Sequence, residues 1–107
     1  MMSVLIYALA AMLEIAGCFA VWSWWRGTAG VVWLVPGAFA LAGFALLLAM
    51  TPPAVAGRSF AAYGGIYVAA SLGWMWAVER AVPDRVDLLG VLIVLAGAAV
   101  ILWVPRG

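Results

Sequence analysis

The chain is a succession of apolar runs, separated by short stretches that hold nearly all of its charged side chains. Hydrophobic residues make up 70% of the 107 positions and charged residues 8%. A soluble domain has about 25% charged residues, and an α-helix needs roughly 20 apolar residues to cross a bilayer. The sequence therefore predicts an all-α membrane protein with no separate soluble domain.

Turn-forming and charged stretches divide the chain into four expected transmembrane helices, which form a single domain over residues 1–107. These stretches are a glycine-containing turn at 27–30, a proline-containing segment at 51–53 and a charged loop at 79–87. Asp87 is expected to cap the last helix, because a negative charge suits a helix N-terminus. The expected spans are residues 2–25, 31–50, 59–77 and 88–104.

Composition also argues against several classes of function. The net charge is only +1, which gives no electrostatic basis for binding a nucleic acid. The chain has no histidine and a single cysteine, Cys18, so we expect no metal site, no cofactor and no internal disulfide. Nothing near Cys18 in the sequence could act as its base, so we expect it to pack rather than react, and we do not expect an enzyme.

Glu14 is the one charged side chain in the first apolar run and lies near its middle. A helix of that length spans roughly 36 Å, so the carboxyl would lie close to the bilayer midplane. An ionised carboxylate there costs about 3 kcal/mol, and ionisable residues at that depth are usually functional. We therefore expect Glu14 to bind either a proton or, when ionised, a cation. The alternative is a permanently protonated Glu14 that hydrogen-bonds across a helix interface.

The helical face around Glu14 carries mostly small side chains. The space they leave could admit water, a substrate or another helix. If two chains paired, two Glu14 side chains would reach one cavity and their protonation would be coupled. The neighbours at three, four and seven residues are Tyr7, Ala10, Ala11, Gly17, Cys18 and Val21.

A polar and aromatic stripe follows one face of the third expected span. Tyr63, Tyr67, Ser71 and Trp74 recur at spacings of four, four and three residues. Aromatic faces of this kind attract organic cations through the ring quadrupole, whereas the plainer interpretation is interfacial tyrosines and packing.

Glycines mark two further places in the chain. The adjacent Gly64 and Gly65 weaken a helix and permit close approach or a kink. Gly90 and Gly97 lie seven residues apart in the last span, where small residues let membrane helices approach closely. That approach is either packing within one subunit or contact with a second one.

The arginines give almost no bias in orientation. Four spans put Arg58 and Arg106 on one side of the membrane and Arg26, Arg80 and Arg85 on the other. Because positive charge usually marks the cytoplasmic side, three against two fixes neither orientation. We therefore expect insertion in both directions, which would allow an antiparallel pair.

These features together resemble the small multidrug resistance superfamily, and the local sequences are closest to its YnfA-like branch. The likeness covers essentially the whole chain. It rests on Glu14-Ile15-Ala16-Gly17-Cys18, on Arg58 with Ala61-Ala62-Tyr63-Gly64-Gly65-Ile66-Tyr67, and on the Gly90 and Gly97 pair.

The resemblance implies a four-helix bundle in the bacterial inner membrane that pairs as an antiparallel homodimer. It also implies exchange of protons for a small cationic substrate by alternating access. Carried over to this sequence, Glu14 is the shared proton and substrate site, Tyr63, Tyr67 and Trp74 are candidate wall residues, Gly64 and Gly65 the flexible point, and Gly90 and Gly97 the dimer contact.

The function expected from the sequence is therefore proton-coupled export of small, often hydrophobic cations. Two alternatives remain open at this point. One is a structural or regulatory membrane protein that transports nothing. The other is an exporter of a polar metabolite or a guanidinium-like compound.

Overall fold

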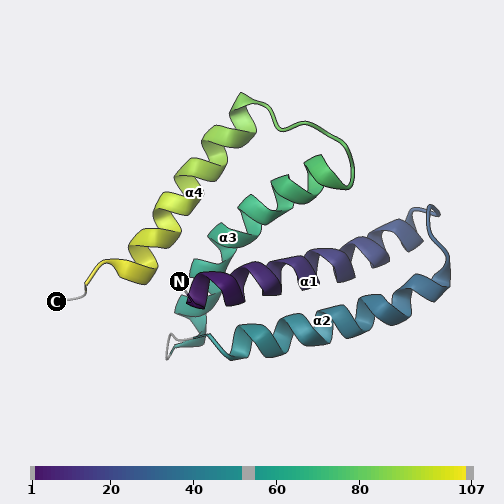
Figure 1. Ribbon diagram of the computed structural model, residues 1–107, viewed down its shortest axis with the longest axis horizontal. Helices are drawn as coiled ribbons and strands as arrows, with labels where there is room; N and C mark the ends of the chain where they lie inside the picture. Colours follow the sequence, from purple (N-terminus) through teal and green to yellow (C-terminus); the bar gives the residue numbers. More distant parts are fainter. Residues whose placement is uncertain (1, 52–54, 106–107) are drawn as a thin grey trace.

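The computed structural model describes residues 2–51 and 55–105. Within these residues the structure has four α-helices, one short 3-10 helix and no strand (Figure 1). The prediction of an all-α chain with four helices is confirmed. The elements are α1 (Met2–Trp25), η1 (Val31–Trp33), α2 (Leu34–Ala49), α3 (Ala56–Ala77) and α4 (Arg85–Trp103).

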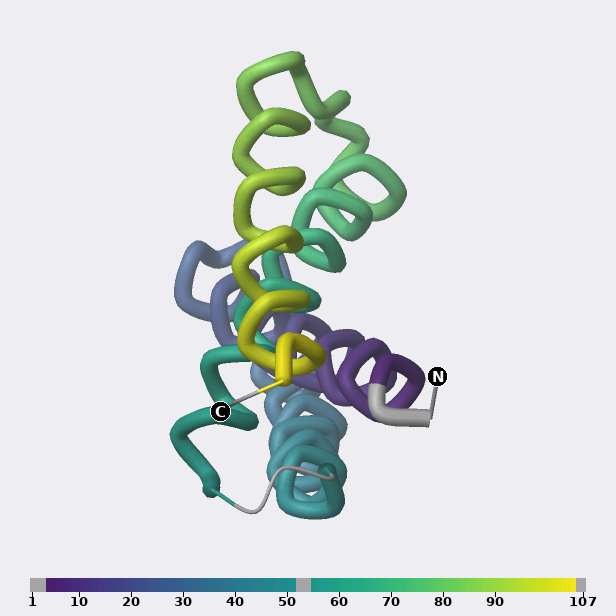
Figure 2. The backbone as a smooth tube through the Cα atoms, turned by 90° about the vertical axis from the view of Figure 1, so that its left-hand side faces the viewer, coloured from purple at the N-terminus to yellow at the C-terminus, as the bar shows by residue number. Residues whose placement is uncertain are grey.

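The helices form two hairpins that meet along α1 and α3. In the described part of the chain, α1 packs against α2 and α3, whereas α4 contacts α3 alone. Figure 1 shows α4 on the far side of α3 from α1 and α2, and Figure 2 shows the α3–α4 loop well above the α1–α2 pair. The extents of 52 × 34 × 19 Å describe a flat, open arrangement. A single copy therefore leaves much of α2 and α4 exposed.

Glycines bring α1 and α2 into close contact. A Cβ atom on Gly17 would lie 2.6 Å from Cγ of Leu41 and 2.8 Å from the carbonyl oxygen of Gly37. A Cβ atom on Gly37 would lie 2.9 Å from Cβ of Ala20. Larger side chains at these positions would force the two helices apart, which is why small residues mark contacts between membrane helices.

The adjacent glycines of α3 have different surroundings. A Cβ atom on Gly65 would lie 2.5 Å from Cβ of Ala98 and 3.3 Å from the carbonyl oxygen of Val94, both in α4. A Cβ atom on Gly64 would meet nothing within 4 Å. Gly65 thus permits the close approach of α3 and α4, and α3 continues as a helix through both positions.

The buried core is small and lies where α1 meets α3. Tyr7 is fully buried there together with small side chains, and Tyr63 is 6% exposed. By contrast, large apolar side chains such as Phe39, 75% exposed, and Val86, 78% exposed, cover the outside. Such a surface suits contact with lipid, in which apolar exposure carries no penalty. The core cluster is Tyr7, Ala10, Ala11, Ala62 and Tyr63.

Three helices are long and apolar enough to cross a membrane, among the described residues. They are Val4–Trp25, Val31–Ala49 and Arg85–Trp103. The third expected span, α3, is less apolar because it carries glycines, tyrosines and serines along its length. It is also the helix that contacts all the others. A helix that packs against other helices needs fewer lipid-compatible side chains, so the lower hydropathy of α3 does not exclude a transmembrane position. That α3 forms the fourth span stays a prediction.

The helix ends show how the sequence terminates each segment. Gly27, with φ +78°, ends α1 in the left-handed conformation that glycine adopts without strain. The N-cap of α4 is Asp84 rather than Asp87, so the prediction that Asp87 caps this helix is wrong. Asp87 is instead the third helical residue, and its carboxylate accepts from the Asp84 backbone N–H while Asp84 accepts from that of Asp87.

Candidate functional site

The central pair of the site is Glu14 of α1 and Tyr63 of α3. The Tyr63 hydroxyl donates a hydrogen bond to Oε1 of Glu14 at 2.6 Å. This length lies within the range of well-formed O–H···O hydrogen bonds. Glu14 is half-buried and Tyr63 is buried, so the bond fixes the carboxyl against α3. Oε2 accepts no hydrogen bond from any described residue.

Three aromatic rings surround the Tyr63 ring. Phe44 of α2 lies 5.6 Å from it between centroids, and Tyr7 and Tyr67 each lie 6.0 Å away. Tyr67 belongs to the stripe expected from the sequence and Tyr7 to the expected neighbours of Glu14. Phe44 was missed, because only helix packing brings α2 to this point. The rings hold Tyr63 in one orientation and therefore hold its hydroxyl on Glu14.

A chain of hydroxyls lies at the end of the site nearest the start of α1. Thr51 uses its single proton to donate to the carbonyl oxygen of Leu48 at 2.7 Å. Ser59 must then donate to Thr51, and the buried Tyr7 hydroxyl must donate to Ser59 at 3.2 Å. This chain ties α1, the end of α2 and the start of α3 together. Ser59 and Thr51 were not recognised from the sequence, because their partners lie on other helices.

The small side chains beside Glu14 bring neighbouring helices close. Ala10 and Ala11 are fully buried in the core, and Gly17 is covered by Leu41 of α2. Of the three occupants considered for this face, another helix is therefore what fills these positions. Cys18, the single cysteine of the chain, is exposed.

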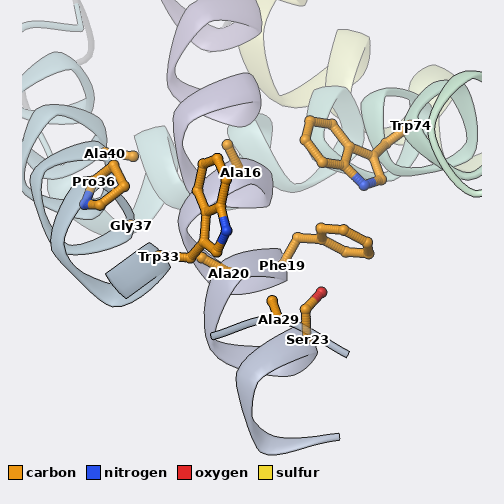
Figure 3. A pocket seen from close by; sticks show the side chains of 10 residues that line it. All are labelled: Ala16, Phe19, Ala20, Ser23, Ala29, Trp33, Pro36, Gly37, Ala40 and Trp74. Atoms are coloured by element: carbon orange, nitrogen blue, oxygen red, sulfur yellow. The ribbon is translucent and has the colours of Figure 1, made fainter. Parts of the chain in front are cut away.

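Two cavities lie on the tryptophan-rich side of Glu14. The larger, of about 380 Å³, lies between α1 and the start of α2 and is almost wholly apolar, with Trp33 and Pro36 in its wall (Figure 3). The smaller, of about 250 Å³, lies between α1 and α3. Phe19 and Trp74 line both, and their rings meet edge to face at 5.5 Å. Glu14 lines neither cavity.

The stripe expected on the third span divides into two parts. Tyr63 binds Glu14, whereas Tyr67, Ser71 and Trp74 line the smaller cavity. Oγ of Ser71 and Nε1 of Trp74 are buried and have no hydrogen-bond partner in the described part of the chain. Leaving such a group unpaired costs about 1–3 kcal/mol, so these two atoms lower the stability of this part of α3.

The glycines expected at a dimer contact face outward. A Cβ atom on Gly90 or Gly97 would meet nothing within 4 Å. The contact of α4 with α3 instead uses Ala98. Among the described residues, no group of three His, Cys, Asp or Glu side chains is placed to hold a metal ion.

Comparison with known proteins finds matches that cover nearly the whole chain. The family described as "Uncharacterised BCR, YnfA/UPF0060 family" matches residues 1–107. The chain is also 57% identical over 105 residues to a UPF0060 membrane protein of Rhizobium etli, covering 98% of this chain and 99% of that protein. No solved structure matches the chain.

Proposed function

The chain belongs to the YnfA/UPF0060 family of membrane proteins, and from that premise we propose that it is a proton-coupled exporter of small, often hydrophobic cations. The observation that carries the proposal is the hydrogen bond from Tyr63 to Glu14, the lone carboxyl of an otherwise uncharged α1. The relation to small multidrug resistance transporters is part of this proposal. So is a place in the bacterial inner membrane.

Exchange follows from competition for one carboxylate. Ionised Glu14 attracts a cation, and protonated Glu14 does not, so binding of one displaces the other. Tyr63 donates to Oε1 and holds the carboxyl against α3, which leaves Oε2 to take either the proton or the cation. Tyr63, Tyr67 and Trp74 present ring faces along α3 that suit an organic cation.

The surroundings of Glu14 differ between the direction of the start of α1 and the direction of its end, as alternating access requires. Toward the start of α1, the Tyr7 and Phe44 rings and the hydroxyl chain through Ser59 close the site. Toward the end of α1, both cavities lie within a few helical turns. This arrangement supports a state open on the tryptophan-rich side, with Gly64 and Gly65 as the flexible point of α3 when the state changes.

A second copy of the chain would complete the assembly. In one copy, α4 contacts only α3 among the described elements, and Gly90 and Gly97 present open space on its surface. A homodimer through this face would bury small residues, as helix contacts in membranes do. The balanced arginines favour an antiparallel pair, in which each copy opens toward a different side.

Flux through reconstituted protein tests the proposal. Liposomes that contain the wild-type protein should accumulate tetraphenylphosphonium when the lumen is more acidic than the outside. Glu14→Gln keeps the shape of the side chain and removes its proton, so accumulation should cease. Equal accumulation by both proteins would refute the assigned role. Binding without flux in either protein would favour a structural or regulatory role.

A further inference from the structure

The larger cavity is a narrow slot between α1 and the start of α2. Ser23 and Ala29 lie at one end of it, and Ala16 and Ala40 lie at the other (Figure 3). Ser23 is seven residues from Ala16, so the slot follows α1 for roughly 10 Å. Its volume of about 380 Å³ then gives a mean cross-section of roughly 40 Å², well below that of an α-helix 10–12 Å in diameter. The slot therefore suits a thin chain rather than a helix.

The slot runs from the membrane interface toward the bilayer interior. The exposed Trp24 and Trp25 follow its outer end along α1, and tryptophans of a transmembrane helix favour the level of the lipid headgroups. The hydrocarbon of one leaflet is roughly 15 Å deep, so a slot of roughly 10 Å that begins there reaches about two thirds of the way to the midplane. Lipid acyl chains run in the same direction through the same depth.

The slot is continuous with the surface that faces lipid. Trp33 forms part of its wall and is 58% exposed, and the neighbouring Val32 and Val35 are exposed as well. The wall is almost wholly apolar, and among the described lining residues Ser23 supplies the one hydroxyl. A water molecule needs two to four polar partners, so water is a poor occupant. An acyl chain that enters from the adjoining lipid would meet apolar side chains throughout.

We propose that this slot binds one acyl chain of a membrane phospholipid, with the first carbons of the chain beside Ser23 and later carbons toward Ala16 and Ala40. The headgroup contributes little. Arg26 is the one charged side chain of residues 26–33, and its guanidinium lies 4.0 Å from the ring centroid of Trp22, which lines the other cavity. Recognition is therefore of the chain, and the site goes beyond the proposed function without depending on it.

Native mass spectrometry of delipidated protein in maltoside detergent tests the site, with dioleoyl-phosphatidylcholine as the probe. Ala40→Leu fills the inner end of the slot, so the affinity for the first bound lipid should fall at least about fivefold as buried methylenes are excluded. Ala16→Leu fills the same end from α1 and should give a similar loss. Ala38→Leu makes the same change at an exposed position of α2 outside the slot and should leave the affinity unchanged.

Three results would overturn the site. They are no lipid bound to the wild-type protein, an unchanged affinity in both Ala16→Leu and Ala40→Leu, and an equal loss in Ala38→Leu. A lower cross-linked dimer fraction in Ala40→Leu liposomes, with lipid affinity unchanged, would show that a second copy covers the slot instead.

Chain length and headgroup test how the lipid is held. Each carbon of an extended chain advances about 1.2 Å, so a six-carbon chain reaches roughly 7 Å and stops short of Ala40. Dihexanoyl-phosphatidylcholine should therefore bind wild-type and Ala40→Leu protein within about twofold of each other, and a loss equal to that of the dioleoyl lipid would contradict the direction of the chain. Dioleoyl-phosphatidylglycerol, which is anionic, should bind within about twofold of the phosphatidylcholine. A preference of tenfold or more would overturn recognition by the chain.

Discussion

The hydroxyl of Tyr63 lies 2.6 Å from Oε1 of Glu14 and joins the middle of α1 to α3. The two residues are 49 positions apart in the chain, so packing of the helices alone brings them together. The bond gives the carboxyl a fixed position and engages only one of its two oxygens. Under the proposed function, a proton or cation that binds Glu14 would act on the contact between the two hairpins, which would link occupancy to helix arrangement.

Removing the Tyr63 hydroxyl tests this link. Tyr63→Phe keeps the ring among Tyr7, Phe44 and Tyr67 but leaves the carboxylate without its donor. Without that hydroxyl the carboxyl is no longer held against α3, so cation affinity should fall by up to about tenfold, the equivalent of one hydrogen bond of about 1.4 kcal/mol. Calorimetry with tetraphenylphosphonium measures the affinity. The control is Tyr67→Phe, whose hydroxyl forms no bond with Glu14; an equal loss there would contradict the account.

The adjacent glycines of α3 should respond oppositely to alanine. Gly65→Ala places a methyl group 2.5 Å from Cβ of Ala98 and should destabilise the protein by about 1–3 kcal/mol. Gly64→Ala meets nothing within 4 Å and should stabilise α3 by about 0.5–1 kcal/mol. Unfolding in detergent measures both. If the rate of proton–cation exchange in liposomes is lower for the more stable Gly64→Ala protein, Gly64 acts as a flexible point of α3. An unchanged exchange rate would argue against that role.

The outward glycines of α4 provide a test of pairing. Gly97→Leu fills open space within one copy, so the fold of the monomer should persist while the proposed dimer contact is blocked. The dimer fraction measured by cross-linking in liposomes should fall several-fold. Gly73→Leu makes the same change at an open position of α3 and should leave the dimer intact. Equal dimer fractions in the two variants would exclude α4 as the interface.

The hydroxyl chain predicts that substitutions at Tyr7 and Ser59 lower the free energy of unfolding by different amounts. Tyr7→Phe removes the first donor and leaves Ser59 still bound to Thr51, so the free energy of unfolding should fall by less than about 1 kcal/mol. Ser59→Ala leaves the fully buried Tyr7 hydroxyl without a partner and should cost about 1–3 kcal/mol. Denaturation in detergent distinguishes the two. A larger loss from Tyr7→Phe would show that the order of donors is wrong.

Features that repeat within one helix were predictable from the sequence. Glu14 is distinguished by being the single charge in its run, and the stripe of Tyr63, Tyr67 and Trp74 by its spacing. The helix boundaries followed from the same patterns to within a few residues. Near Asp84 the error came from choosing the wrong member of a reciprocal pair, although the spacing of three residues to Asp87 is typical of a capping box.

Contacts between helices were not predictable in the same way. Phe44, Ser59 and Thr51 reach the site only because α2 and α3 pack where they do. Glu79 was interpreted as one charge of a solvated loop, and spacing within α3 could not show that it lines a cavity with α1. Such contacts depend on how helices cross, which side-chain periodicity along a single helix does not determine.

The most direct test of the central claim is proton release on cation binding. Purified protein in a weakly buffered solution receives tetraphenylphosphonium, which has no titratable proton, so any acid released comes from the protein. Wild-type protein and Glu14→Asp, which keep a carboxyl at this position, should release protons, and Glu14→Gln should release none. Equal proton release from wild-type and Glu14→Gln protein would contradict exchange at Glu14.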